Sequence, residues 1–166
     1  MARIDLVEQE LTGAVIGAFY DVYNNLGFGF LEHLYIMALE RELLARNHEV
    51  ARQVCVNVMY KGVKLGVQRL DMIVDRKLIV EIKSTFILHP AATRQVYNYL
   101  RGTNLEVGLL LHFGPEPRVH RMLCRNGKST KRSDTGAAVD VPNVRDPDLA
   151  PPPNPSHPDA SVPRIS

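Results

Sequence analysis

The chain has 166 residues, of which 45% are hydrophobic and 23% are charged, and its formal net charge is +2. These values exclude a fully disordered chain, a collagen and a coiled coil, and they exclude binding to nucleic acid by bulk positive charge alone. No apolar run approaches the ~18 residues that a membrane-spanning helix needs. The first residues lack the order of a signal peptide and only two cysteines are present, so we expect a cytoplasmic protein without membrane contact or disulfides.

The prolines are concentrated near the C-terminus, where eight of the 11 lie in the last 26 residues. Prolines remove backbone donors, and this stretch has almost no apolar periodicity. A polar stretch with four basic residues, 125–136, precedes it. We therefore expect one folded domain over residues 5–124 and a polar, proline-rich flexible tail over 125–166. The alternative to a solvated tail is a proline-rich ligand or a basic arm for phosphates.

Helical and strand periods follow one another in a clear order along the folded part. Apolar spacings of three and four predict a helix over 5–26, ended by Gly27, and a second helix over 31–46. Alternation and aliphatic runs then predict the later elements, which are strands over 54–60, 63–65, 68–74 and 78–83, a helix over 91–100, and strands over 107–113 and 119–124. This order predicts an α/β fold of two or three layers with a mixed sheet.

The most informative segment is 69–84, in which two aliphatic strands flank the short polar connection 75–77. If this connection is a three-residue loop, the numbers of opposed residues sum to 152 and Asp71 lies directly across from Glu81. Opposed side chains have Cβ atoms roughly 4.5–5.5 Å apart. Lys83 shares the face of Glu81, because strands have a two-residue period. A two-residue loop would shift the register and separate these groups.

Two carboxylates at this spacing repel each other unless a cation lies between them. Mg²⁺ is bound in proteins through one or two carboxylates and keeps positions for water and phosphate oxygens. Such an ion lowers the pKa of a water and stabilises charge on phosphorus, and a neighbouring lysine could orient the water or stabilise the transition state. The alternative is a solvated hairpin face with an acid–lysine pair, and the hairpin by itself favours this alternative.

Other polar residues have two interpretations each. Glu32, in the first turn of the second helix, either complements the helix dipole or points an acidic group at the hairpin. Gln95, one turn before Tyr99, is either an ordinary polar residue of an amphipathic helix or holds a water or phosphate. Five cations are candidate phosphate contacts that would position a backbone without reading sequence: Lys61, Lys64, Arg69, Arg94 and Arg101.

Together these segments resemble the GxxExxY proteins of the PD-(D/E)xK nuclease-like superfamily. The resemblance covers about residues 10–124 and implies a restriction-endonuclease-like core, with a mixed central β-sheet flanked by α-helices. It rests on Gly29-x-x-Glu32-x-x-Tyr35, Tyr60-Lys61-Gly62, Arg69-Leu70-Asp71, Glu81-Ile82-Lys83, Gln95-x-x-Asn98-Tyr99-Leu100, Gly108-Leu109-Leu110 and Phe113-Gly114.

The resemblance also implies roles for individual residues. It makes Asp71 and Glu81 metal ligands, with the carbonyl of Ile82 as an extra ligand and Mg²⁺ or Mn²⁺ as the cofactor. Lys83 completes the (D/E)xK motif, and a helix acid and a glutamine match Glu32 and Gln95. Two positions depart from the family, because relatives often have a histidine at the position of Ala92 and an asparagine at that of His112. These departures leave the substrate contacts open.

We therefore predict a metal-dependent nuclease that hydrolyses phosphodiester bonds of nucleic acid, most directly DNA, by a metal-activated water. Its catalytic residues would be Glu32, Asp71, Glu81, Lys83 and Gln95. The alternative is a non-catalytic nucleic-acid-binding or protein-interaction module on the same fold. A homodimer would be natural if both strands of a duplex are cut. A zinc hydrolase is disfavoured, because no histidines form an i, i+4 ligand pair.

Overall fold

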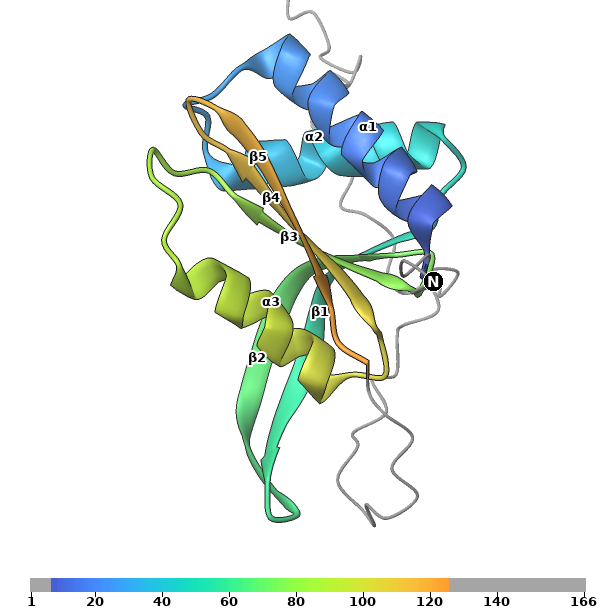
Figure 1. Cartoon of the computed structure of the whole chain (residues 1–166), viewed down its shortest axis with the longest axis vertical. Helices are drawn as coiled ribbons and strands as arrows, with labels where there is room; N and C mark the ends of the chain where they lie inside the picture. The colour runs from blue at the N-terminus through green and yellow to red at the C-terminus, as the bar shows by residue number, and fades with distance from the viewer. Residues whose placement is uncertain (1–6, 126–166) are drawn as a thin grey trace, which may run out of the picture.

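The computed structural model describes residues 7–125, which form a mixed five-stranded sheet with helices on both faces (Figure 1). In Figure 1, α1 and α2 lie together on one face of the sheet and α3 lies on the other. The elements in chain order are α1 (Gln9–Leu26), α2 (Glu32–Ala45), β1 (Val50–Tyr60), β2 (Val63–Val74), β3 (Leu78–Lys83), α3 (Ala91–Gly102), β4 (Val107–Phe113) and β5 (Pro117–Leu123).

The five strands lie side by side in the order of the chain, β1-β2-β3-β4-β5. Only the β3–β4 pair is parallel, and the other three pairs are antiparallel. A parallel pair needs a crossover connection, which α3 provides. The predicted restriction-endonuclease-like α/β fold with a mixed sheet is therefore confirmed.

Each face of the sheet has its own hydrophobic core. On the α1/α2 face, the ring of Phe113 packs against Tyr35, with centroids 4.1 Å apart, and against Phe19, at 4.7 Å. On the other face, α3 buries Val96 and Leu100 among residues of β2, β3 and β4. Every residue of β4 is buried, as its uninterrupted apolar sequence predicts for a strand covered on both sides.

The predicted separation of 63–65 from 68–74 is wrong, because both belong to the single strand β2. The register between β1 and β2 shifts between Val58 and Met59. One extra residue on a strand is accommodated there as a bulge, so the chain continues through Gly66 without a turn. The β1–β2 hairpin is consequently long, and in Figure 1 its tip projects beyond α3.

One residue pair is missing from the middle of the β1–β2 ladder. Arg52 pairs with Met72 and Val54 pairs with Leu70, but Gln53 and Asp71 between them are not paired. Gln53 has a φ of 52°, in the left-handed region that a residue other than glycine adopts infrequently. Leu70, before Asp71, and Ile73, after it, both pack in the core under α3. At Asp71, β2 therefore changes the face of the sheet to which its side chains point.

The connection between β2 and β3 is the three-residue loop that the sequence predicts. Val74 pairs with Leu78 and Met72 with Val80, so the register sum of 152 is confirmed over these pairs. Asp75 and Arg76 take φ values of 50° and 58°. The Asp75 carboxylate accepts a hydrogen bond from the Glu49 backbone N–H at 2.8 Å, which holds the loop against the start of β1.

Residues 126–166, which include nearly all of the predicted flexible tail, lie outside the described residues. Within residues 7–125, no helix combines the length and apolar character needed to cross a bilayer.

The close approach of α3 to β4 gives a stability prediction. A Cβ atom on Gly108 would lie 2.6 Å from Val96 Cγ1, so we expect Gly108→Ala to lower the free energy of unfolding by about 1–3 kcal/mol. Gly13, in α1, has nothing within 4 Å of its Cβ position, and Gly13→Ala should raise the same quantity by about 0.5–1 kcal/mol. Urea denaturation measures both changes. Equal effects of the two substitutions would contradict this packing.

Candidate active site

The predicted site lies where β2 separates from β3. Their backbone pairing extends to Met72 and Val80, and the next residue on β2, Asp71, uses its side chain instead. Asp71 Oδ2 accepts a hydrogen bond from the Ile82 backbone N–H at 2.8 Å. This bond fixes the Asp71 carboxylate beside the backbone of Ile82, although the predicted pairing of Asp71 with Glu81 is not among the observed backbone pairs.

The same hydrogen bond determines where the Ile82 carbonyl points. A strand residue directs its N–H and its C=O toward the same neighbouring strand. Because the Ile82 N–H points toward Asp71, its carbonyl oxygen also faces the β2 side, where β2 no longer pairs. The structure therefore places the Asp71 carboxylate beside the backbone of Ile82 and close enough to Glu81 for their charges to interact.

Glu81 is an almost fully buried carboxylate with one unused oxygen. Only 2% of the residue is exposed. Its Oε1 accepts a hydrogen bond from Lys83 Nζ at 2.7 Å, whereas its buried Oε2 has no partner among residues 7–125. Burial, together with the nearby charge of Asp71, raises the pKa of Glu81 to about 7. A buried carboxylate oxygen without a donor favours either a proton or a cation at this position.

The neighbouring charges have coupled protonation states. Burial raises the pKa of Asp71, while the hydrogen bond from Ile82 and the charge of Lys83 oppose this rise. Burial by itself would lower the pKa of Lys83, but the hydrogen bond to Glu81 and the surrounding carboxylates raise it overall. The site is therefore a group of acidic side chains around one ammonium. The positive charge of this ammonium does not balance the carboxylates around it.

Glu32 reaches this group from the first turn of α2. Its Oε2 accepts a hydrogen bond from the Ser84 backbone N–H at 3.2 Å, and Ser84 Oγ donates to the carbonyl of Phe30 at 2.6 Å. These bonds join the end of β3 to the loop between α1 and α2. The charge of Glu32 acts on both Asp71 and Glu81.

The rest of the Gly-x-x-Glu-x-x-Tyr motif has a structural role. Gly29 has a φ of 105°, which favours glycine. Tyr35 is fully buried, and its hydroxyl donates to the carbonyl of Gly27 at 2.8 Å and accepts from the N–H of Phe30 at 3.3 Å. The glycine and the tyrosine thus shape the loop that places Glu32.

Gln95 lies on α3, beside the acidic group. Its Nε2 donates to the Tyr99 hydroxyl at 2.7 Å, and that hydroxyl donates to the carbonyl of Arg69 at 3.1 Å. Burial raises the pKa of Tyr99, and so does the charge of Glu81. The amide oxygen of Gln95 has no partner among the described residues, so it is free to accept a hydrogen bond from water or substrate.

The five predicted phosphate contacts are spread along the molecule. Lys64 is seven residues from Asp71 along β2, roughly 23 Å at the rise of a strand, and Lys61 lies in the turn at the tip of the hairpin. Arg94 and Arg101 are on α3, and Arg69 is exposed on β2. The structure therefore does not gather these cations around the acidic group, and Lys61 and Lys64 lie far from it.

Some residues of the site were not predicted. Ser84 bonds to Glu32, and its only signal in the sequence is its place directly after Lys83. His112 pairs with Lys83 in the β3–β4 register, and its Nε2 donates to the Thr85 carbonyl at 2.7 Å. His112 thereby holds the first residue of the loop that follows Ser84. The sequence signals His112 only because relatives in the family often have an asparagine at this position.

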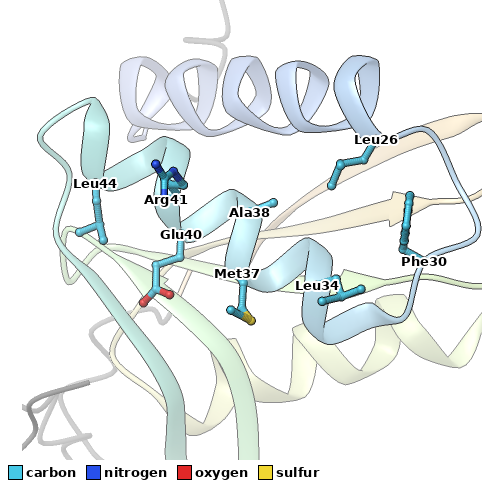
Figure 2. Close-up of a pocket in the computed structure, with 8 residues that line it drawn as sticks. All are labelled: Leu26, Phe30, Leu34, Met37, Ala38, Glu40, Arg41 and Leu44. Atoms are coloured by element: carbon cyan, nitrogen blue, oxygen red, sulfur yellow. The ribbon is translucent and has the colours of Figure 1, made fainter. Parts of the chain in front are cut away.

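A separate apolar groove of about 530 Å³ runs along α2 (Figure 2). None of the predicted catalytic, metal-binding or phosphate-binding residues lines it. The lining residues are Leu26, Phe30, Leu34, Met37, Ala38, Glu40, Arg41 and Leu44.

The oxygen atoms of the site suit a hard divalent cation. Among residues 7–125, no three His, Cys, Asp or Glu side chains are grouped to hold an ion. Asp71, Glu81 and the Ile82 carbonyl together offer only oxygen atoms. Mg²⁺ is bound by one or two carboxylates, with water and phosphate completing its coordination. The unpartnered Glu81 Oε2 therefore fits a hard divalent cation.

Comparisons with known proteins give one family. The family model described as the PD-(D/E)XK nuclease superfamily matches residues 9–122. Among curated proteins, none matches the chain. The solved structure described as the crystal structure of SSO0001 is similar, with a TM-score of 0.41 and 20% sequence identity. The similarity covers 70% of this chain and spans 58% of the length of that one.

The raised pKa of Glu81 predicts a pH-dependent stability without metal. Below about pH 4.5 the group is protonated in both states; from there to about pH 7 only the unfolded chain loses the proton. The free energy of unfolding should therefore fall as the pH rises through this window. Glu81→Gln lacks this titrating group. With EDTA present, its free energy of unfolding relative to that of the wild type should therefore increase by about 3 kcal/mol between pH 4.5 and pH 8.

Urea denaturation across this pH range measures the difference. The matched control is Glu116→Gln, which removes an exposed carboxylate and should follow the wild type at every pH. An advantage of Glu81→Gln that stays constant with pH would contradict the buried, proton-binding state of Glu81.

Proposed function

This chain belongs to the PD-(D/E)XK nuclease superfamily, and from that premise we propose that it is a metal-dependent nuclease. Its reaction is the hydrolysis of phosphodiester bonds in nucleic acid, with DNA as the substrate to test first. Nucleases of this superfamily generally use divalent metal ions. A cytoplasmic location, expected from the sequence, suits such a substrate.

One observation carries the proposal, namely the convergence of Asp71, Glu81 and Lys83 where β2 parts from β3. A carboxylate oxygen buried without a hydrogen-bond donor is costly in a folded protein. Glu81 Oε2 is such an atom, and the acid beside it raises the cost further. A bound divalent cation would remove this cost, which supports a site made for cation binding over an accidental ion pair.

Asp71, Glu81 and the carbonyl of Ile82 would hold Mg²⁺ or Mn²⁺. The ion would supply a water of lowered pKa and would neutralise negative charge on the phosphate oxygens. Hydrolysis would add a water to phosphorus while the bond to one ester oxygen breaks, and the leaving oxygen would gain a proton.

The side chains around them would position the reactants. Lys83 Nζ, held 2.7 Å from Glu81 Oε1, places a cation where it can orient the water and stabilise charge that develops on phosphorus. Gln95 has an amide oxygen without a partner among the described residues, and this oxygen can accept a hydrogen bond from water or substrate. Glu32 keeps the end of β3 in place through Ser84 and adds negative charge that favours the metal.

The substrate would be bound by local groups, because the net charge of the chain is only +2. Arg69, Arg94 and Arg101 lie on the elements next to the site, and Lys61 and Lys64 on the hairpin would contact nucleic acid farther away. A single copy of the site suffices to cut one strand. A homodimer would bring a second site to a duplex.

A second candidate function is a non-catalytic nucleic-acid-binding or protein-interaction module. The exposed apolar groove along α2 favours it, since such patches mark interaction surfaces. This alternative predicts binding that is indifferent to divalent metal and that survives Glu81→Gln. The two candidates therefore separate on metal dependence.

Nuclease assays test the roles of the acidic residues and the lysine. With Mg²⁺ or Mn²⁺, we expect the full chain to cut single-stranded, duplex or branched DNA, because a charged site can stabilise the transition state. Asp71→Asn, Glu81→Gln and Lys83→Ala should each lower the rate by about 100-fold or more. The exposed control Glu116→Gln should retain the wild-type rate. Variants at Asp71 and Lys83 that cut as well as the wild type would overturn the proposal.

Metal binding can be measured separately from cleavage. Isothermal titration with Mg²⁺ at pH 8 should show binding to the wild type, and Asp71→Asn should weaken it by at least tenfold, because one of two carboxylate ligands is lost. At about 100 times its dissociation constant, Mg²⁺ should add about 2.7 kcal/mol to the free energy of unfolding. Binding should weaken at pH 5, where Glu81 holds its proton. Binding that is equal in Asp71→Asn and wild type would contradict this ligand set.

A further inference from the structure

A cavity of about 240 Å³ opens directly beside Lys83 and Gln95, which both line it. Its other walls come from the loop between β3 and α3 and from the first turn of α3, including Ile87, Leu88 and Ala92. The cavity is continuous with the acidic site, because two of the site's own side chains form one side of it.

The size and lining of this cavity fit one flat ring system. Pockets for drug-sized ligands measure about 300–1,000 Å³, so a cavity of 240 Å³ admits a smaller group. The apolar walls suit the faces of an aromatic ring. No acidic side chain is among the residues that line the cavity itself.

Two lining residues retain hydrogen-bonding atoms for the edge of such a ring. The amide oxygen of Gln95 is a free acceptor, because its nitrogen is the atom bonded to Tyr99. His89 Nδ1 accepts a hydrogen bond from the Ala91 backbone N–H at 3.1 Å, so in the neutral ring the proton is on Nε2, which is a donor. One acceptor and one donor beside apolar walls match the polar edge and apolar faces of a nucleobase.

The loop that forms the outer wall carries two unusually exposed apolar side chains. Phe86 is 76% exposed and Ile87 is 78% exposed, although His112 and Thr85 tie the start of this loop to the sheet. Exposed aromatic side chains beside a nucleic-acid site stack on unpaired bases. A base within a duplex must lose its pairing and its stacking before it can enter a cavity of this kind, and an unpaired base enters without the pairing cost.

Given the proposed nuclease function, on which this assignment rests, we infer that the cavity is a subsite for one unpaired nucleobase next to the scissile phosphate. Phe86 stacks on a neighbouring base of the same strand. The enzyme therefore acts on single-stranded or frayed DNA in preference to a closed duplex.

Binding without cleavage tests the subsite first. The full chain is titrated, in EDTA, into short DNA single strands that carry 2-aminopurine at successive positions, and fluorescence reports the loss of base stacking. We expect a rise at one or a few adjacent positions for the wild type and for the size-matched control Ala91→Ser. Ala91 is exposed and lines the cavity, so Ala91→Leu fills it and should abolish the rise. No rise with the wild type, or the same rise with Ala91→Leu, would overturn the subsite.

A second variant tests the stacking side chain. Phe86→Ala removes a side chain that is 76% exposed, so the fold should be unaffected. It should weaken single-strand binding by roughly tenfold, the range expected for one base–aromatic stack, and leave duplex binding unchanged. Equal loss on both substrates, or none on either, would contradict the stacking role.

Cleavage then separates this inference from the proposed function. With Mg²⁺, the wild type should cut a single strand roughly tenfold faster than the same strand within a duplex. An abasic nucleotide at the position of the 2-aminopurine rise should slow cutting by a similar factor in the wild type and by less than twofold in Ala91→Leu. Equal cutting of all these substrates overturns the subsite and leaves the nuclease proposal standing. No cutting of any substrate overturns the nuclease proposal, while the fluorescence titration still decides whether a base occupies the cavity.

Discussion

The hydrogen bond from the Ile82 N–H to the Asp71 carboxylate is the interaction on which the site depends. At Asp71 the strand β2 pairs with neither neighbour, because Gln53 opposite it on β1 is also unpaired and the pairing with β3 stops one residue away. The side chain of Asp71 takes over the bond that a backbone carbonyl would otherwise accept. It thereby joins β2 to β3 beyond the last backbone pair of the two strands. The same irregularity that weakens the ladder thus places the Asp71 carboxylate against the backbone of Ile82.

The electrostatic design of the site has a consequence for stability. Glu81 lies on the central strand, and its desolvation is only partly offset by Lys83, because three acidic side chains act on one ammonium. Buried ions with incomplete pairing destabilise a fold. The two hydrophobic cores on either face of the sheet supply the stability that tolerates this arrangement. The near-neutral composition of the chain conceals this local concentration of charge.

Much of this could be predicted from the sequence, and the reason differs from residue to residue. The buried strand β4, the end of α1 at Gly27 and the three-residue loop after Val74 follow from local patterns, and the loop in turn gives the observed register from Val74 with Leu78 to Met72 with Val80. The sequence did not predict that β2 is one continuous strand. The interruption of the apolar alternation at a bulge, here after Val58, resembles that at a turn. Ser84 and the cavity beside Lys83 were missed for another reason. Their contacts join the end of β3 to α2 and α3, and such long-range packing has no sequence period.

The unpaired Gln53 also matters for how copies of this chain meet one another. β1 is at the edge of the sheet, and an open edge is a template on which another strand can add and start aggregation. Such addition needs an unbroken row of backbone donors and acceptors. The left-handed backbone conformation of Gln53 interrupts this row of donors and acceptors partway along β1. The feature that frees Asp71 inside the molecule therefore also interrupts the open edge at β1, so one pair of residues affects both the interior of the sheet and its contact with other chains.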